Sequence, residues 1–227
     1  MSLLIFMIGI CFGSFISCMS QRYITHTSIL GRSHCDYCDH TLHLLDLIPV
    51  LSYIMLKGQC RYCHHKLSKN LLVHEVTAGF LFVLVYLHDG LNILYLSHIC
   101  TLTCFYIISI IDFHLYEIPD TYLLISLLTS FKMIYLKESL FFILFLILFV
   151  YLFYKFTGEE GLGGGDIKML GVCTFSLGFY QTLIILSIAC FLGIIFSFIN
   201  EQKMIPFGPF IAIGWLTISL FDSFIFL

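Results

Sequence analysis

Long apolar runs separated by short polar stretches cover most of this chain. The first run, from Leu3 to Met19, holds 17 residues without a charge. Further runs lie at about 71–87, 93–111, 121–136, 139–156, 168–180, 182–199 and 206–226. Most of them approach the roughly 20 residues that a helix needs to cross about 30 Å of hydrocarbon. The pattern predicts an all-α, polytopic membrane protein with about eight transmembrane helices.

The stretch 168–199 is where this helix count is least fixed. Its first half, 168–180, has 13 residues, which are too few to cross a membrane at about 1.5 Å per residue. If 168–199 forms one long helix, the count falls to seven and the C-terminus changes sides.

A polar stretch from about 21 to 70 interrupts the apolar pattern after the first run. It holds six of the 11 Lys and Arg residues and six of the ten histidines, but only three acids. The positive-inside rule therefore places it in the cytoplasm. The N-terminus is then outside, and the loops 112–120 and 157–167 are cytoplasmic as well. We expect three parts: a first transmembrane helix at 1–20, a cytoplasmic loop domain at 21–70 and a transmembrane domain at 71–227.

The composition supports a lipid environment and removes one class of partner. Hydrophobic residues make up 59% of the chain and charged residues 11%, against roughly 25% charged residues in soluble domains. The formal charge of −3 provides no general basic surface for a nucleic acid, so we expect none as a partner.

Two C-x2-C pairs lie in the polar stretch, with 21 residues between them: Cys35 and Cys38, then Cys60 and Cys63. Zinc takes four thiolates in a tetrahedron, and two such pairs supply all of them. Disulfides are disfavoured in a reducing cytoplasm. Because no position remains for water, we expect structural zinc that staples a loop with few large apolar residues. Four histidines are alternative ligands: His34, His40, His64 and His65.

Three acids in the later loops are candidates for chemistry. Asp112 ends an apolar helix, where the helix dipole disfavours a negative charge, so local structure gives little reason for it. Asp120 follows Pro119 and is expected to cap the next helix. Asp166 follows a glycine-rich stretch that begins at Gly161, and either caps the next helix or takes part in chemistry.

A pair of acids at this depth has defined chemical properties. If Asp112 and Asp166 converge, burial and mutual repulsion raise the pKa of the pair, and the two carboxyl groups share a proton near neutral pH. One carboxylate can then activate water as a general base, while the protonated partner polarises a peptide carbonyl.

Together these motifs resemble the prepilin peptidases, the type IV leader peptidase family of polytopic aspartic proteases. Residues 163–168, Gly-Gly-Gly-Asp-Ile-Lys, match the family signature G-x-G-D-x-K, and 112–120 match the signature D-x6-P-D. The cysteine pairs match its zinc loop, 46–53 match a segment inside that loop, and Gly13-Ser14-Phe15 with Arg22 match its opening motif. The resemblance implies that Asp112 and Asp166 are the catalytic pair. The remaining signature residues are Gly163, Gly165, Lys168, Pro119 and Asp120.

The resemblance also implies a substrate and a location. Such an enzyme lies in the bacterial plasma membrane and acts at its cytoplasmic face. It removes the short basic leader of type IV prepilins, or of competence or secretion pseudopilins, by cutting after a glycine. The expected partners are therefore a prepilin or pseudopilin precursor and the lipid membrane.

A second activity, N-methylation of the new N-terminus with S-adenosylmethionine, occurs in many two-domain members of this family. Glu75 lies just inside an apolar run, where a charge is costly enough to imply a partner. Glu75 and Gly79 match the family's E-x3-G pattern for methylation. Two departures concern this activity alone: residues 70–72 are Asn-Leu-Leu where the family has R-Y-P, and Arg22 lacks the proline two residues later.

Two other classes of protein share part of the pattern. A membrane zinc transporter or sensor would use the cysteines and histidines, but it predicts metal ligands in the middle of a span, and the spans show none with suitable spacing. An intramembrane aspartyl protease of the presenilin type also has a G-x-G-D element. That family lacks the paired cysteines, and its other acid lies well inside a helix.

Overall fold

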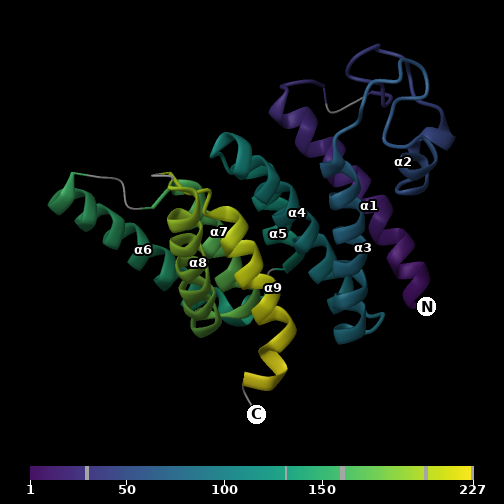
Figure 1. Cartoon of the computed structure of the whole chain (residues 1–227). Helices are drawn as coiled ribbons and strands as arrows, with labels where there is room; N and C mark the ends of the chain where they lie inside the picture. Colours follow the sequence, from purple (N-terminus) through teal and green to yellow (C-terminus); the bar gives the residue numbers. More distant parts are fainter. Residues whose placement is uncertain (29–30, 131, 159–161, 202–203, 226–227) are drawn as a thin grey trace. The chain divides into compact units, whose positions relative to one another are not determined.

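A computed structural model describes residues 1–28, 31–130, 132–158, 162–201 and 204–225. Gly161, where the glycine-rich stretch begins, and the last two residues of the predicted domain 71–227 lie outside this description. Within the described residues, helices dominate and the β-type pairing consists of two isolated bridges. The prediction of an all-α protein is confirmed (Figure 1).

The chain forms two compact units, Met1–Tyr95 and Leu96–Leu227. The first contains α1 (Ser2–Ile24), the 3-10 helix η1 (Leu44–Leu47), α2 (Leu51–Met55) and α3 (Lys69–Asp89). Helix α4 (Ile93–Leu115) begins in the first unit and runs into the second. The second also contains α5 (Asp120–Ser130), η2 (Met133–Tyr135), α6 (Leu136–Thr157), α7 (Gly164–Leu177), α8 (Phe179–Asn200) and α9 (Gly208–Ile225). The predicted division at 20/21 and 70/71 stays a prediction, because it rests on membrane topology and not on compactness.

Each predicted apolar run contains a helix. Among the described residues, five helices are long and apolar enough to cross a membrane: α1, α3, α4, α6 and α8. Helix α9 is also apolar but shorter, and α5 and α7 are shorter still. The chain is therefore a multi-pass membrane protein.

The stretch 168–199 belongs to two helices that meet at Gly178. Helix α7 ends at Leu177 and α8 begins at Phe179. Gly178 between them has a φ of 101°, a conformation that favours glycine because other residues carry a Cβ. The alternative of one long helix, with a total of seven, is therefore wrong.

The helix in the predicted run 121–136 ends earlier than the run does. Helix α5 ends at Ser130, and the backbone N–H of Lys132 donates to the carbonyl oxygen of Phe175 at 3.2 Å instead of extending the helix. Nearby, the N–H of Phe179 donates to Oε2 of Glu138 at 3.3 Å. These contacts gather the C-terminal ends of α5 and α7, so both helices begin at the opposite end of the second unit.

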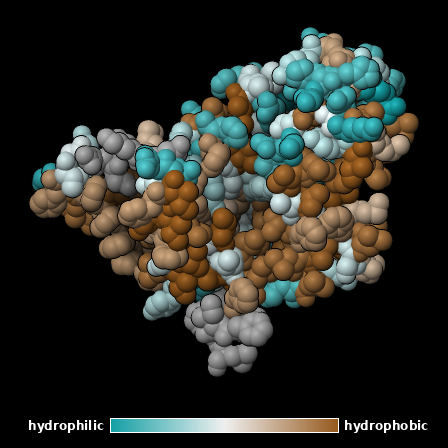
Figure 2. Space-filling view, in the orientation of Figure 1, coloured by the Kyte–Doolittle hydropathy of each residue, from teal (hydrophilic) through white to brown (hydrophobic). Residues whose placement is uncertain are grey.

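Glycines bring α1 and α3 unusually close in the first unit. A Cβ on Gly9 would lie 2.8 Å from Cα of Gly79, and one on Gly13 would lie 2.6 Å from Cα of Glu75. Small residues four apart allow such an approach between membrane helices. On the face shown in Figure 2, hydrophobic residues cover this helix pair and hydrophilic residues gather over the segment between α1 and α3.

Candidate active site and metal centre

Asp112 lies in the last turn of α4, which extends four residues beyond the predicted run. Its side chain is buried, and its Oδ2 accepts a hydrogen bond of 2.8 Å from the N–H of Gly208, the first residue of α9. A carboxylate at a helix N-terminus meets unpaired N–H groups and the positive end of the dipole. Local structure gives little reason for Asp112, as expected, but a second helix 96 residues away in the sequence stabilises its carboxyl group.

Asp166 is the third residue of α7, and Gly163 is the N-cap of that helix. Its carboxylate accepts a hydrogen bond from the Gly163 N–H, which is half of a capping box. The charges of Asp112 and Asp166 interact electrostatically. The second unit thus brings the two acids near each other, and each has a carboxyl group bound by the backbone at the start of a helix.

The glycine-rich stretch forms part of a helix. Gly164 and Gly165 are the first residues of α7, and no described glycine of this stretch has a positive φ. A Cβ on Gly165 would lie 2.8 Å from Cβ of Ile118. Gly165 therefore allows the close approach of the loop before α5.

Substituting Gly165 by alanine is expected to destabilise this contact. The added methyl group must displace Ile118, and overpacking of this kind costs about 1–3 kcal/mol. The matched control is Gly164→Ala, because a Cβ there meets no atom within 4 Å. We expect a lower thermal unfolding midpoint in detergent for Gly165→Ala alone. Equal midpoints for the two variants would contradict the assigned contact.

The last signature residues also connect α5 to α7. Nζ of Lys168 lies 2.6 Å from Oδ1 of Asp120, the first residue of α5. Both side chains are exposed, and such pairs contribute about 0–1 kcal/mol. Pro119 is buried, and its carbonyl oxygen accepts from the N–H of Leu123. These contacts align the two signature loops.

The four cysteines of the polar stretch form one cluster. Their sulfur atoms all lie within 4.8 Å of one another, and Sγ of Cys35 is 3.8 Å from Sγ of Cys63. Zinc–sulfur bonds of about 2.3 Å in a tetrahedron separate the sulfurs by about 3.8 Å. All four are free thiols. Burial opposes the thiolate of Cys60, but N–H groups of Cys63 and Tyr62 lower the pKa of this thiol to about 7. The cluster is thus suited to a structural metal.

An internal repeat of ten residues, 33–42 and 58–67, builds this cluster. In the first copy Cys35 N–H donates to His40 O, and in the second Cys60 N–H donates to His65 O. The copies share cysteine, tyrosine, cysteine, histidine and leucine at equivalent positions. The two copies therefore share a backbone hydrogen bond, and each supplies two of the four cysteines. Alignment of residues 33–42 with 58–67 would have shown the repeat in the sequence, whereas the spacing of the cysteines alone does not.

The two copies exchange aromatic contacts. Tyr37 of the first stacks on His65 of the second with ring centroids 3.2 Å apart, and Tyr62 of the second lies 3.7 Å from His40 of the first. Among the described residues, the only group with metal-type spacing is the four cysteines. The proposed alternative of histidine ligands is therefore not supported, because two of these rings pack on tyrosines.

Asp46 and Glu75 hold this loop in place. Asp46 accepts from Arg61 Nε at 2.7 Å and from the Tyr62 hydroxyl at 3.0 Å. Although burial opposes ionisation of Asp46, these donors hold its pKa below the usual range. Buried Glu75 accepts from the Val50 N–H at 2.7 Å. Val50 has a φ of 63°, which β-branched residues rarely adopt.

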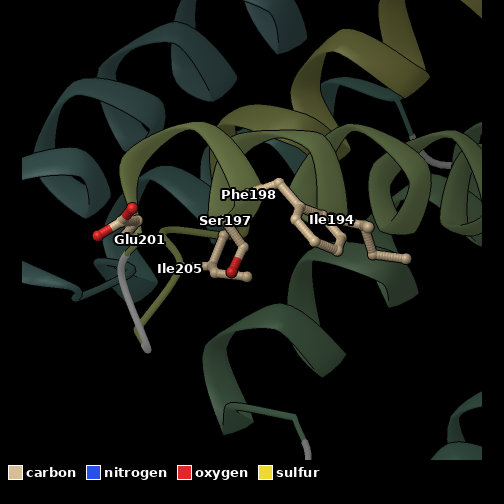
Figure 3. A pocket seen from close by; sticks show the side chains of 5 residues that line it. All are labelled: Ile194, Ser197, Phe198, Glu201 and Ile205. Atoms are coloured by element: carbon tan, nitrogen blue, oxygen red, sulfur yellow. The ribbon is translucent and has the colours of Figure 1, made fainter.

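A separate pocket of about 400 Å³ lies at the C-terminal end of α8 (Figure 3). Its lining is largely apolar and includes none of the predicted site residues. The lining residues are Ile194, Ser197, Phe198, Glu201 and Ile205.

The fold and these two sites define a class: a multi-pass helical membrane protein with paired, backbone-bound aspartates and a four-cysteine loop. Family models give the same result. Residues 7–88 match the bacterial peptidase A24 N-terminal domain, and residues 99–198 match the type IV leader peptidase family. The chain belongs to the type IV leader peptidase family, and the resemblance seen in its motifs is confirmed.

Curated relatives agree over most of the chain. A prepilin leader peptidase/N-methyltransferase of Bacillus subtilis is 28% identical, covering 98% of this chain and 95% of the relative. One of Dichelobacter nodosus is 31% identical, covering 83% and 71% respectively. A type 4 prepilin-like proteins leader peptide-processing enzyme of Escherichia coli is 28% identical, covering 82% and 74%. No solved structure matches. This family membership decides against the presenilin-type and zinc-transporter alternatives.

Proposed function

We propose that this chain is a membrane-embedded aspartic endopeptidase that removes the leader peptide of type IV prepilins or pilin-like precursors. The observation that carries the proposal is the pairing of Asp112 and Asp166, whose charges interact at one end of a helical unit. Its family membership and its relatives' names agree with this activity.

In the proposed mechanism the two carboxyl groups share one proton. The ionised one removes a proton from a water molecule, which attacks the carbonyl carbon of the scissile peptide. The protonated one donates a hydrogen bond to the carbonyl oxygen, where negative charge develops. Each carboxyl group has one backbone N–H donor, from Gly208 or from Gly163. These donors restrict the orientation of the carboxyl groups before the substrate arrives.

The proposed location is the bacterial plasma membrane, with the N-terminus outside and the catalytic loops in the cytoplasm. The excess of basic residues in the polar stretch supports this orientation. The scissile bond of a precursor with a cytoplasmic leader and an apolar helix would then lie near the inner interface, at the depth of both aspartates.

Zinc is the metal that best fits the four-cysteine cluster. Cys35, Cys38, Cys60 and Cys63 would all be ligands, which leaves no open position for water. The metal would therefore stabilise the loop and take no part in peptide hydrolysis. S-adenosylmethionine is the cofactor that a second, N-methylating activity would require.

The Glu75 carboxylate offers a test of that second activity. Glu75→Gln keeps an oxygen that can accept from Val50 but removes the charge, whereas Glu75→Ala removes both. If the charge serves methylation, Glu75→Gln releases an unmethylated mature protein at a normal cleavage rate, with methylation reduced at least about tenfold. The N-terminal mass of the product measures both events. A methylated product from Glu75→Gln would remove this residue from the methylation chemistry.

The proposed function is tested by co-expressing the chain with candidate prepilins and pseudopilins in cells that lack a leader peptidase. Loss of the leader and the exact mass of the new N-terminus are followed by mass spectrometry. A set of precursors that all keep their leaders, despite correct membrane insertion of the enzyme, would refute the proposal.

A further inference from the structure

The N-terminus of α9 offers one particular N–H group to Asp112. Phe207 precedes the helix, and its carbonyl oxygen accepts from the N–H groups of Phe210 and Ile211, both at 3.1 Å. Pro209 has no N–H. Among the first three residues of α9, Gly208 therefore keeps an N–H without an intrahelical acceptor, and this group donates to Oδ2 of Asp112 at 2.8 Å.

Gly208 lies so close to Asp112 that a side chain there would crowd the carboxyl group. A Cβ at this position would lie 3.0 Å from Oδ2 and 3.4 Å from Cγ of Asp112. Its φ is not positive, so backbone conformation does not require glycine. A larger residue would instead require the Asp112 carboxyl group to shift by a few tenths of an ångström.

Helix α9 is also tied to the helix that carries Asp166. Buried Trp215 of α9 donates from Nε1 to Oγ of Ser176 in α7 at 3.1 Å. A Cβ on Gly214 would lie 3.0 Å from the carbonyl oxygen of Ile185 in α8. Because α9 packs tightly on α7 and α8, its N-terminus has a fixed place relative to the start of α7.

We infer that Gly208, at the N-terminus of α9, is a positioning residue of the peptidase site. Its N–H donates to Oδ2 of Asp112 and so restricts the orientation of this carboxyl group. Through Trp215 the same helix sets Asp112 in register with Asp166. This role rests on the proposed function, because it acts through a carboxylate proposed to be catalytic.

Two substitutions at this position separate the steric effect from the hydrogen bond. Gly208→Ala adds a Cβ and keeps the N–H. Gly208→Pro adds a Cβ and removes the N–H, at the first helical position, where proline is tolerated. The matched control is Gly193→Ala on α8, because its Cβ would lie 3.7 Å from the ring of Phe207, an ordinary contact distance.

The experiment measures kcat and KM separately with the purified full chain and a prepilin. We expect kcat to fall about tenfold in Gly208→Ala, because the added Cβ displaces the carboxyl group of Asp112. We expect a fall of about a hundredfold in Gly208→Pro, because this variant also loses a hydrogen bond to a charged group, which contributes about 1.5–3 kcal/mol. KM is expected to stay within about twofold of wild type, and Gly193→Ala is expected to match wild type. Thermal unfolding and metal content, measured on the same samples, correct kcat for the folded fraction.

The outcomes distinguish this inference from the proposed function. If wild type cleaves no precursor, the proposed function fails. If wild type cleaves but Gly208→Ala and Gly208→Pro have the kcat of Gly193→Ala, the positioning role is refuted while the peptidase assignment stands. A kcat loss that disappears after correction for the folded fraction also refutes the positioning role. If Gly208→Pro does not fold, the kcat of Gly208→Ala alone tests this role.

Discussion

Asparagine in place of Asp112 or Asp166 is expected to lower kcat for leader removal by about 10²- to 10⁴-fold. Asparagine keeps the shape and can still accept from Gly208 or Gly163, but it cannot take up or release the proton that the proposed mechanism needs. Because the two carboxyl groups act as a unit, the double variant should be little worse than either single variant. Conversion of a purified prepilin, followed by mass spectrometry, measures the loss.

The control for these variants is Glu117→Gln, which neutralises an exposed acid in the loop between α4 and α5. It should retain the wild-type rate. A single aspartate variant that cleaves within about threefold of wild type would remove that residue from the proposed catalytic pair.

Replacement of Cys60 by serine is expected to release the metal and unfold the loop between α1 and α3. A four-cysteine zinc site contributes about 10–16 kcal/mol to the folding of zinc-finger peptides, far more than the few contacts of Asp46 and Glu75 contribute. Zinc per chain, measured by elemental analysis, should fall from one to near zero. Trypsin should then cut at Arg32, Lys57 and Arg61 much faster than in wild type.

The matched control is Cys11→Ser, since Cys11 is exposed on the apolar helix α1 and far from the sulfur cluster in sequence. It should keep one metal ion and a protected loop. A Cys60→Ser protein with undiminished zinc, or a wild-type chain that purifies without metal and resists trypsin equally well, would contradict a structural zinc site.

Much of the fold and both sites follow from local sequence patterns. The apolar runs predict the helices because lipid requires every backbone N–H to be paired within its own segment. The spacing of Cys35, Cys38, Cys60 and Cys63 predicts the sulfur cluster because metal geometry fixes that spacing. Asp112 stands out in the sequence because it is an acid at the C-terminal end of a helix, where the dipole disfavours a negative charge.

The remaining features depend on contacts between distant segments. The helix that binds Asp112 starts at Gly208, and no local pattern in either segment encodes their meeting. The close contact of Gly165 with Ile118 also joins two segments that are far apart in the sequence. Glu75 was expected to have a partner, and it has two: the backbone N–H of Val50 and the side chain of Ser14. Neither contact has a local signature, because both residues are far from Glu75 in the sequence.

The repeated halves of the cysteine loop have a consequence for biosynthesis. Neither copy holds more than two sulfurs, and the tyrosine ring of each packs against a histidine ring of the other. As the chain leaves the ribosome, the first copy has no complete site until Cys63 and His65 have emerged. The loop can therefore close only a few residues before α3 begins at Lys69. We expect capture of the proposed metal and insertion of the second membrane helix at nearly the same stage of translation.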